Sequence, residues 1–380
     1  MGAQTGSAAL TLGLPALGPQ FRSELGVSLV GVGALLAAPT IGYMFTMFLW
    51  GALSDRVGER PVMVTGLAGS AIVLAVASAQ HHPWTLGPAL ALAGSFGAAA
   101  PAASGRAVVA WFPPDQRGLA LGLRHTSPMI GGAVGAIALT VASARWGIGG
   151  AMLTLAVLAM IGATAAVGVP AAPWDGAGAV RPARPHPVAD RLVWVLAAAG
   201  GLVIVGQAVL LRFQPVYLHD ERGWGGSATA ALLSLTLLGA AVARVIAGLV
   251  SDRLDRRIPV LAAQAVGAGA LILVAALLLA APSVVAATLL AGATVLTMAG
   301  NGVAYAAIAE AVPDRTGAAL GMYSTVLIVV VSLAPPLFGL VADRVTWALG
   351  FTVVGLFPLA ATLLLIRAER HQAARRVSSV

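Results

Sequence analysis

The sequence contains no cysteine, which excludes disulfide bonds, thiolate metal sites and enzymes that use a cysteine nucleophile. Charged side chains are also scarce: they make up 9% of the 380 residues, whereas 59% of the residues are hydrophobic. A chain of this composition cannot cover a water-facing surface, so it must present most of its side chains to lipid. Short stretches of alternating polarity, which are typical of membrane barrels, are missing as well. We therefore predict an all-α polytopic membrane protein.

Long apolar runs recur along the whole chain. A helix needs about 20 residues to cross the hydrocarbon core of a bilayer, which leaves room for twelve crossings. We predict transmembrane helices at residues 3–20, 28–53, 61–79, 85–112, 117–143, 147–170, 192–218, 226–250, 258–281, 283–311, 316–341 and 346–367. No basic segment precedes the first run and no cleavage-like site follows it, so we expect a retained first helix and no cleavable signal sequence.

The basic residues are all arginine, and their placement predicts the orientation of the chain. With both termini in the cytoplasm, fourteen arginines fall in cytoplasmic turns and in the tail. Four fall in the opposite loops, namely Arg22, Arg145, Arg222 and Arg344. This bias follows the positive-inside rule and predicts a multi-pass protein of the bacterial inner membrane. It also explains the formal charge of +8 without a nucleic-acid partner.

The chain divides into two similar halves. GALSDRVGERPV begins at Gly51 and GLVSDRLDRRIPV begins at Gly248, and a second matched pair begins at Asp115 and Asp314. Because both pairs are displaced by nearly the same number of residues, a six-helix unit has been duplicated. A segment rich in proline, glycine and alanine separates the copies. We predict a six-helix bundle over 1–170, a cytoplasmic linker over 171–190, a second six-helix bundle over 191–367 and a cytoplasmic tail over 368–380.

The turn after the second predicted helix carries the pattern G-x-L-x-D-R-x-G-x-R, formed by Gly51, Leu53, Asp55, Arg56, Gly58 and Arg60. By this pattern the chain resembles the major facilitator superfamily (MFS) over essentially its whole length. The second copy keeps Asp252, Arg253 and Arg257 but has Asp255 where the first has Gly58. The resemblance implies two pseudo-symmetric bundles in a 12-helix fold. It further implies a monomeric secondary active transporter that works by alternating access, without enzymatic activity or a cofactor.

The resemblance also implies that this turn is a cytoplasmic latch, which holds the halves together while the protein is open outward. Its residues would be Gly51, Asp55, Arg56 and Arg60, with Asp252 and Arg253 from the second copy. Arg106 and Arg244 lie near the cytoplasmic ends of their predicted helices, and we expect them to pair with the latch carboxylates rather than with solute. The alternative is a plain charged turn that obeys the positive-inside rule.

Charged side chains inside a bilayer are costly and therefore indicate function. Arg124 lies about 10 Å along its helix from the cytoplasmic turn and is predicted to bind an anionic solute. Pairing with Asp115 or extension to the interface is the alternative. The neighbouring His125 could carry a co-transported proton, or it could be a neutral histidine hydrogen-bonded between helices.

Four neutral polar residues in predicted helices complete the candidate binding site. They are Gln207, Asn301, Tyr305 and Tyr323. Asn301 and Tyr305 are four residues apart and hence share a helix face. Tyr323 occupies the repeat position of Arg124. These residues either line the solute cavity or form hydrogen bonds between helices, and both alternatives remain open.

The sequence leaves the direction of transport and the coupling ion open. SPMIGG (127–132) partly matches the helix 5 motif of proton-driven exporters, with Ser127 in place of a glycine. Leu90 stands where the family often has a proton-linked arginine, so that role is not carried over. The candidate functions are an ion-driven carrier of a small organic anion, a proton-driven multidrug or metabolite exporter, and a non-transporting membrane sensor or assembly protein with a transporter fold. The sequence shows no phosphate-binding loop of a primary pump.

Overall fold

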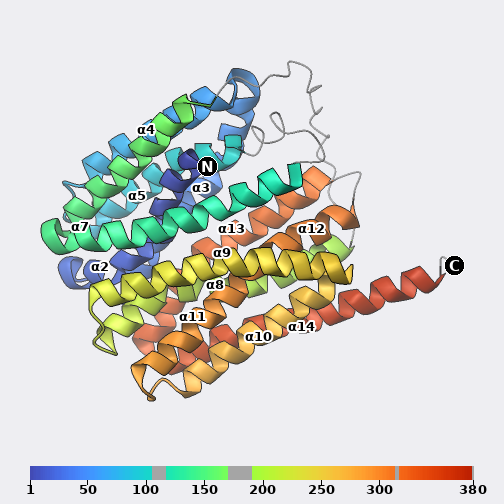
Figure 1. Cartoon of the computed structure of the whole chain (residues 1–380). Helices are drawn as coiled ribbons and strands as arrows, with labels where there is room; N and C mark the ends of the chain where they lie inside the picture. Colours follow the sequence, from blue (N-terminus) through green and yellow to red (C-terminus); the bar gives the residue numbers. More distant parts are fainter. Residues whose placement is uncertain (105–116, 170–190, 313–315, 379–380) are drawn as a thin grey trace. The chain divides into compact units, whose positions relative to one another are not determined.

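A computed structural model describes the backbone of residues 1–104, 117–169, 191–312 and 316–378, and the described residues are helical with short turns (Figure 1). The α-helices are α1 (Gly2–Ala8), α2 (Gly18–Leu25), α3 (Leu29–Val57), α4 (Glu59–Ala77), α5 (Pro83–Gly97), α7 (Arg117–Val167), α8 (Arg191–Asp220), α9 (Gly226–Leu254), α10 (Arg257–Leu277), α11 (Ser283–Ala299), α12 (Asn301–Ala311), α13 (Thr316–Arg344) and α14 (Trp347–Ser378). Within the described part of the chain, ten helical segments are long and apolar enough to cross a membrane. This confirms the predicted all-α membrane fold.

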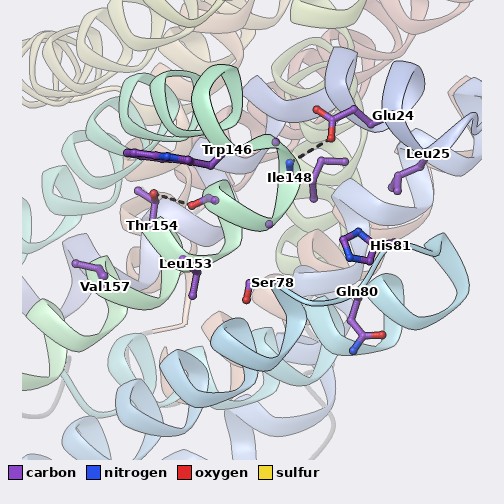
Figure 2. A pocket seen from close by; sticks show the side chains of 13 residues that line it. Glu24, Leu25, Ser78, Gln80, His81, Trp146, Ile148, Leu153, Thr154 and Val157 are labelled. Atoms are coloured by element: carbon purple, nitrogen blue, oxygen red, sulfur yellow. Dashed lines mark hydrogen bonds between the residues drawn. The ribbon is translucent and has the colours of Figure 1, made fainter.

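The segment over Thr126–Val167 contains two crossings rather than one. Its helix is interrupted at Trp146 and Gly147, and Gly147 has a φ of +62°. Glycine adopts this left-handed conformation without a steric penalty, so it allows the chain to reverse direction here. Figure 2 shows this turn, where the Ile148 N–H donates to a carboxylate oxygen of Glu24 at 3.2 Å. The predicted spans 117–143 and 147–170 meet at this turn.

The first predicted span is broken into short pieces. α1 leads into a π-helical turn over Ala9–Gly13 and a 3-10 turn over Leu14–Leu17, and α2 then continues to Leu25. Pro15 has no N–H, so the regular pattern of α-helical hydrogen bonds cannot pass through it unchanged. The helical path over residues 2–25 is therefore irregular and ends five residues beyond the predicted boundary. Together with the turn at Gly147, it makes the ten segments consistent with twelve crossings.

Contacts group the chain into two compact units. The first contains Met1–Ala179, Pro215–Leu238 and Pro335–Asp343, and the second contains Val180–Gln214, Gly239–Ala334 and Arg344–Val380. The first unit thus holds most of the first sequence half together with the ends of α8 and α13 and the start of α9. The boundaries of the predicted bundles were taken from the sequence repeat, whereas the boundaries of these units depend on which helical segments pack together.

Each unit has an apolar interior and an apolar exterior. In the second unit, Val193, Ile258, Ile308 and Tyr323 belong to one buried cluster. In the first unit, Val62, Met63 and Leu67 of α4 form a cluster with alanines of other helices. Large apolar side chains also lie on the outside, as expected where helices face lipid: Phe48 and Leu277 are each 82% exposed.

Candidate transport site and latch

The fourth predicted helix of each sequence half is interrupted. In the first unit α5 ends at Gly97, and the chain becomes helical again at Ala99. In the second unit α11 ends at Ala299 and α12 begins at Asn301, with Gly300 between them. Broken helices in membrane proteins are tolerated where polar groups satisfy the freed backbone, and in transporters they commonly line the solute site.

A polar side chain contacts the backbone at each break. In the first unit the Ser7 hydroxyl donates to the Gly97 carbonyl at 2.9 Å and is also hydrogen-bonded to Tyr43. In the second unit the Arg244 guanidinium donates to the Met298 carbonyl at 3.2 Å. An orphaned carbonyl in a low-dielectric environment would be costly, so these side chains stabilise the two interruptions. Arg244 was predicted for the latch, and this contact places its guanidinium at the break.

Arg124 is anchored just beyond the break in the first unit. Its Nε donates to the Ser104 hydroxyl at 3.0 Å, and a terminal nitrogen donates to the Pro101 carbonyl at 2.8 Å. These two contacts orient the guanidinium beside the helix break. His125 follows on α7, and its side chain lies outside the described ones.

The four neutral residues predicted for the site lie in the second unit and are connected through α12. The Asn301 amide donates to the Gln207 amide oxygen at 3.1 Å. Tyr305, on the same face of α12, is hydrogen-bonded to Ser324 at 3.0 Å, and its ring stands edge-on to that of Tyr323 with centroids 5.1 Å apart. Tyr323 occupies the repeat position of Arg124, and each of the two contacts a residue of the preceding crossing helix.

A small cavity of about 30 Å³ adjoins this polar group. Asn301, Thr297, Tyr323 and Gln264 contribute to its lining. A cavity of this size with several polar neighbours can hold a water molecule. Gln264 and Ser324 were not among the residues predicted from the sequence. Their only sequence signal is a polar residue in an apolar span, which does not distinguish them from the many serines and threonines that bond to their own helix.

The latch sequence after α3 requires an unusual backbone. Gly58 lies between α3 and α4 with φ +87° and ψ 166°, a conformation essentially restricted to glycine. In the second copy Asp255 has φ +49°, and aspartate is among the residues that tolerate this left-handed region. The replacement of Gly58 by Asp255 in the degenerate repeat thus keeps a left-handed turn between paired helices.

Gly58→Ala is expected to lower the free energy of unfolding by about 1–3 kcal/mol, because alanine is strained in this conformation. Asp255→Gly is expected to change it by less than about 1 kcal/mol, since glycine accepts the same turn. Gly51→Ala is the matched control, because nothing lies within 4 Å of a Cβ added there. Thermal unfolding of the three variants in detergent measures the difference. Equal stability of Gly58→Ala and Gly51→Ala would contradict this explanation of the repeat.

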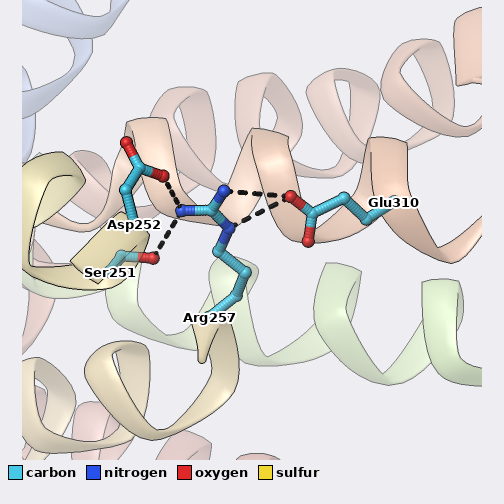
Figure 3. Close-up of polar contacts among 4 residues, drawn as sticks. All are labelled: Ser251, Asp252, Arg257 and Glu310. Atoms are coloured by element: carbon cyan, nitrogen blue, oxygen red, sulfur yellow. Dashed lines mark hydrogen bonds and ion pairs between the residues drawn. The ribbon is translucent and has the colours of Figure 1, made fainter. Parts of the chain in front are cut away.

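Charged residues from three helices meet at the second copy of the latch (Figure 3). Arg257 is bonded to Asp252, to the Ser251 hydroxyl at 2.8 Å and to the Glu310 carboxylate at 3.0 Å. Asp252 was predicted, whereas Arg257 and Glu310 were not assigned to the latch. Arg257 aligns with Arg60, so the repeat could have indicated it. Glu310 lies 53 residues away along the chain, and no local pattern indicates this pairing.

The remaining latch residues are placed as follows. Gly51, Asp55 and Arg56 lie in the last turns of α3, and Arg60 lies at the start of α4. The side chains of Asp55, Arg56, Arg60 and Arg253 are exposed. Arg106 lies outside the described residues.

Polar contacts also occur at the opposite end of the first unit. The Asp343 carboxylate accepts hydrogen bonds from the Leu29 and Val30 N–H groups, each at 3.1 Å. These are the first residues of α3, where a negative charge is favoured by the helix dipole. Arg22 forms an ion pair with Asp220 at 3.1 Å. Both contacts join the first sequence half to elements of the second, and neither was predicted from the sequence.

The comparisons with known proteins agree with the duplicated helices and broken spans. The family model described as Major Facilitator Superfamily matches residues 5–301 and 196–379. The chain is 32% identical over 357 residues to an uncharacterized MFS-type transporter of Mycobacterium tuberculosis, covering 93% of this chain and 80% of that protein. The chain belongs to the major facilitator superfamily.

A second relative of this MFS protein is the probable sulfoacetate transporter SauU of Cupriavidus necator, which is 25% identical over 89% of this chain and 84% of its own length. Solved structures share the MFS fold. A bacterial homologue of the human lysosomal transporter Spinster, inward-facing and occupied, matches with a TM-score of 0.76, 15% identity and coverage of 97% of this chain and 95% of its own. The nucleoside transporter NupG matches with a TM-score of 0.74, 12% identity and coverage of 97% and 98%. The protein is therefore a multi-pass membrane protein of a transporter family.

Proposed function

We propose that this protein is a secondary transporter that carries a small organic anion across the bacterial inner membrane by alternating access, driven by an ion gradient. The observation that carries the proposal is the position of Arg124 in a membrane helix, beside the interruption that follows α5. Its guanidinium is oriented by hydrogen bonds to the Ser104 hydroxyl and the Pro101 carbonyl. An arginine oriented in this way can bind a carboxylate or sulfonate through two parallel hydrogen bonds.

The second unit has its own group of polar side chains beside a helix break. Asn301 and Gln207 contribute amides, and Tyr305 contributes a hydroxyl, all beside the break between α11 and α12. Arg244 donates to the Met298 carbonyl at the same break. The name of SauU supports the chemical class, since sulfoacetate is a small organic anion. Amide and hydroxyl groups of this kind can bind polar substituents of an organic solute.

The contacts at the two ends of the helices support a cycle of opening and closing. In the first unit Asp343 caps the start of α3 and the Gly58 turn follows its other end, and in the second unit the group around Arg257 lies at the start of α10. Exposed contacts of this kind are each worth about 1 kcal/mol or less, so they can be broken and remade during transport. Both termini in the cytoplasm would put the Gly58 turn on the cytoplasmic side.

Reconstitution into proteoliposomes tests the proposal. The probe is the organic anion that raises the thermal stability of the protein most in a screen that begins with sulfoacetate, because a ligand that binds only the folded state stabilises it. We expect the vesicles to accumulate this anion against its gradient. A sensor with a transporter fold would bind the anion without moving it, and that result would contradict the proposal.

Collapse of the pH gradient is expected to stop accumulation in the same vesicles if His125 couples transport to protons. Exchange of labelled for unlabelled anion should continue, because it needs no driving force. Accumulation that is indifferent to both the pH gradient and a sodium gradient would contradict ion-driven transport.

Export is the second candidate, and it rests on the partial exporter motif in α7. A Cβ at Gly131 would overlap the backbone of Thr5, so the two helices are in close contact at this motif. The direction of proton movement distinguishes the two functions. Proton exchange against the anion indicates export, and proton movement together with the anion indicates import.

A further inference from the structure

A pocket of about 750 Å³ opens at the end of the first unit that is remote from the Gly58 turn (Figure 2). It lies where three chain reversals meet: the end of α2, the turn between α4 and α5, and the turn within α7 at Gly147. It belongs neither to the helix breaks nor to the latch. Its volume falls in the range of sites that bind drug-sized molecules.

The pocket has a polar part formed by Glu24, Gln80 and His81. Figure 2 shows Glu24 and His81 on the same side of the pocket. One oxygen of Glu24 accepts the Ile148 N–H, just after the turn in α7, at 3.2 Å. A Cβ at position 147 would lie 3.2 Å from that oxygen, so Gly147 lets the carboxylate approach closely. The negative charge of Glu24 is thus held at a defined place in the pocket.

The other part of the pocket is apolar and continuous with the lipid-facing surface. Trp146, Leu153 and Val157 line it and are 67%, 49% and 58% exposed. Leu153 and Val157 are four residues apart on a crossing helix and therefore share one face. Trp146 lies at the end of that helix, at the level where tryptophan is enriched in membrane proteins. An exposed apolar surface of this kind offers no hydrogen bonds to a water-soluble ligand, whereas it can pack against the acyl chain of a lipid.

We propose that this pocket binds a phospholipid with a primary amine in its headgroup, such as phosphatidylethanolamine. The ammonium group pairs with the Glu24 carboxylate, and the phosphate accepts hydrogen bonds from the Gln80 amide and the His81 ring. An acyl chain lies along Leu153 and Val157 beside the Trp146 ring. The site is separate from the proposed anion site, so its lipid is a bound component of the protein and not its solute.

Competition between two lipids with identical acyl chains tests the assignment. The full-length protein is incubated with an equimolar mixture of phosphatidylethanolamine and phosphatidylglycerol, and the retained lipids are counted by native mass spectrometry. We expect the wild type to retain the amine lipid about tenfold over the glycerol lipid, and Glu24→Gln to retain both equally. The glutamine oxygen can still accept the Ile148 N–H, so the turn is kept. Glu221→Gln, another exposed carboxylate at the same end, is the control and should keep the preference.

Two further arms separate the parts of the site. His81→Ala should reduce the retention of both lipids several-fold, because each has a phosphate. Soluble glycerophosphoethanolamine in equal amount should displace neither lipid. An unchanged preference in Glu24→Gln, unchanged retention in His81→Ala, or full displacement by the soluble headgroup would each overturn the proposal.

Discussion

Arg124→Gln is expected to reduce transport of the organic anion by about 100-fold or more while the protein remains folded. Removal of one partner of a desolvated charge pair costs about 2–5 kcal/mol, and every 1.4 kcal/mol corresponds to a factor of ten in affinity. Glutamine can still donate to the Pro101 carbonyl, so the local packing should survive. Initial rates of anion uptake by proteoliposomes, normalised to the amount of protein, measure the effect.

Two variants serve as controls for Arg124. Arg124→Lys keeps the charge but loses the planar arrangement of donors, and we expect transport between that of the wild type and Arg124→Gln. Arg145→Gln removes an exposed arginine from the same α7 and should transport normally. Normal transport by Arg124→Gln would exclude this residue from the anion site.

Gly339→Leu is expected to hold the end of the protein near Asp343 open. A Cβ at this position would lie 2.6 Å from the Leu29 carbonyl carbon and 2.7 Å from the Val30 nitrogen, which are backbone atoms that cannot move aside as a side chain can. The contact between α13 and α3 would therefore be lost, together with the bonds from Asp343. We expect transport to fall at least tenfold, because the helices can no longer close at this end.

The absence of cysteine allows this opening to be measured directly. Val32→Cys places a thiol at a buried position of α3 close to the contact, and its modification should be at least tenfold faster in Gly339→Leu. Gly321→Leu is the matched control on the same helix, because nothing lies within 4 Å of a Cβ added there. Equal rates in Gly339→Leu and Gly321→Leu would refute the assignment of this contact to closure.

The sequence was sufficient for the fold because its signals are local. Apolar runs predict the crossings, and the repeat that begins at Gly51 and Gly248 predicts the duplication. Asn301 and Tyr305 share a helix face because they are four residues apart. Arg124 and Tyr323 occupy matching positions of the repeat, and the side chain of each contacts the preceding crossing helix. Such features depend on periodicity and on comparison of the chain with itself.

Other features depend on contacts between distant segments. Ser7 and Gly97 are 90 residues apart, and Leu29 and Asp343 are 314 residues apart. Each contact involves a residue type that is common at helix ends, so neither produces a pattern in one sequence. The irregular path of the first crossing was missed for a different reason. Pro15 indicates that the helix must deviate, but helices in membranes tolerate proline in several ways.

In the proposed transport cycle, the two ends of the protein open in alternation around the anion. The most direct test uses two single-cysteine reporters on α3, Val32→Cys near one end and Ser54→Cys near the other, both at buried positions. With the probe anion added, and again in the background of Gly339→Leu, the modification rate of one thiol should rise as that of the other falls. Rates that change in the same direction at both ends, or at neither, would contradict alternating access.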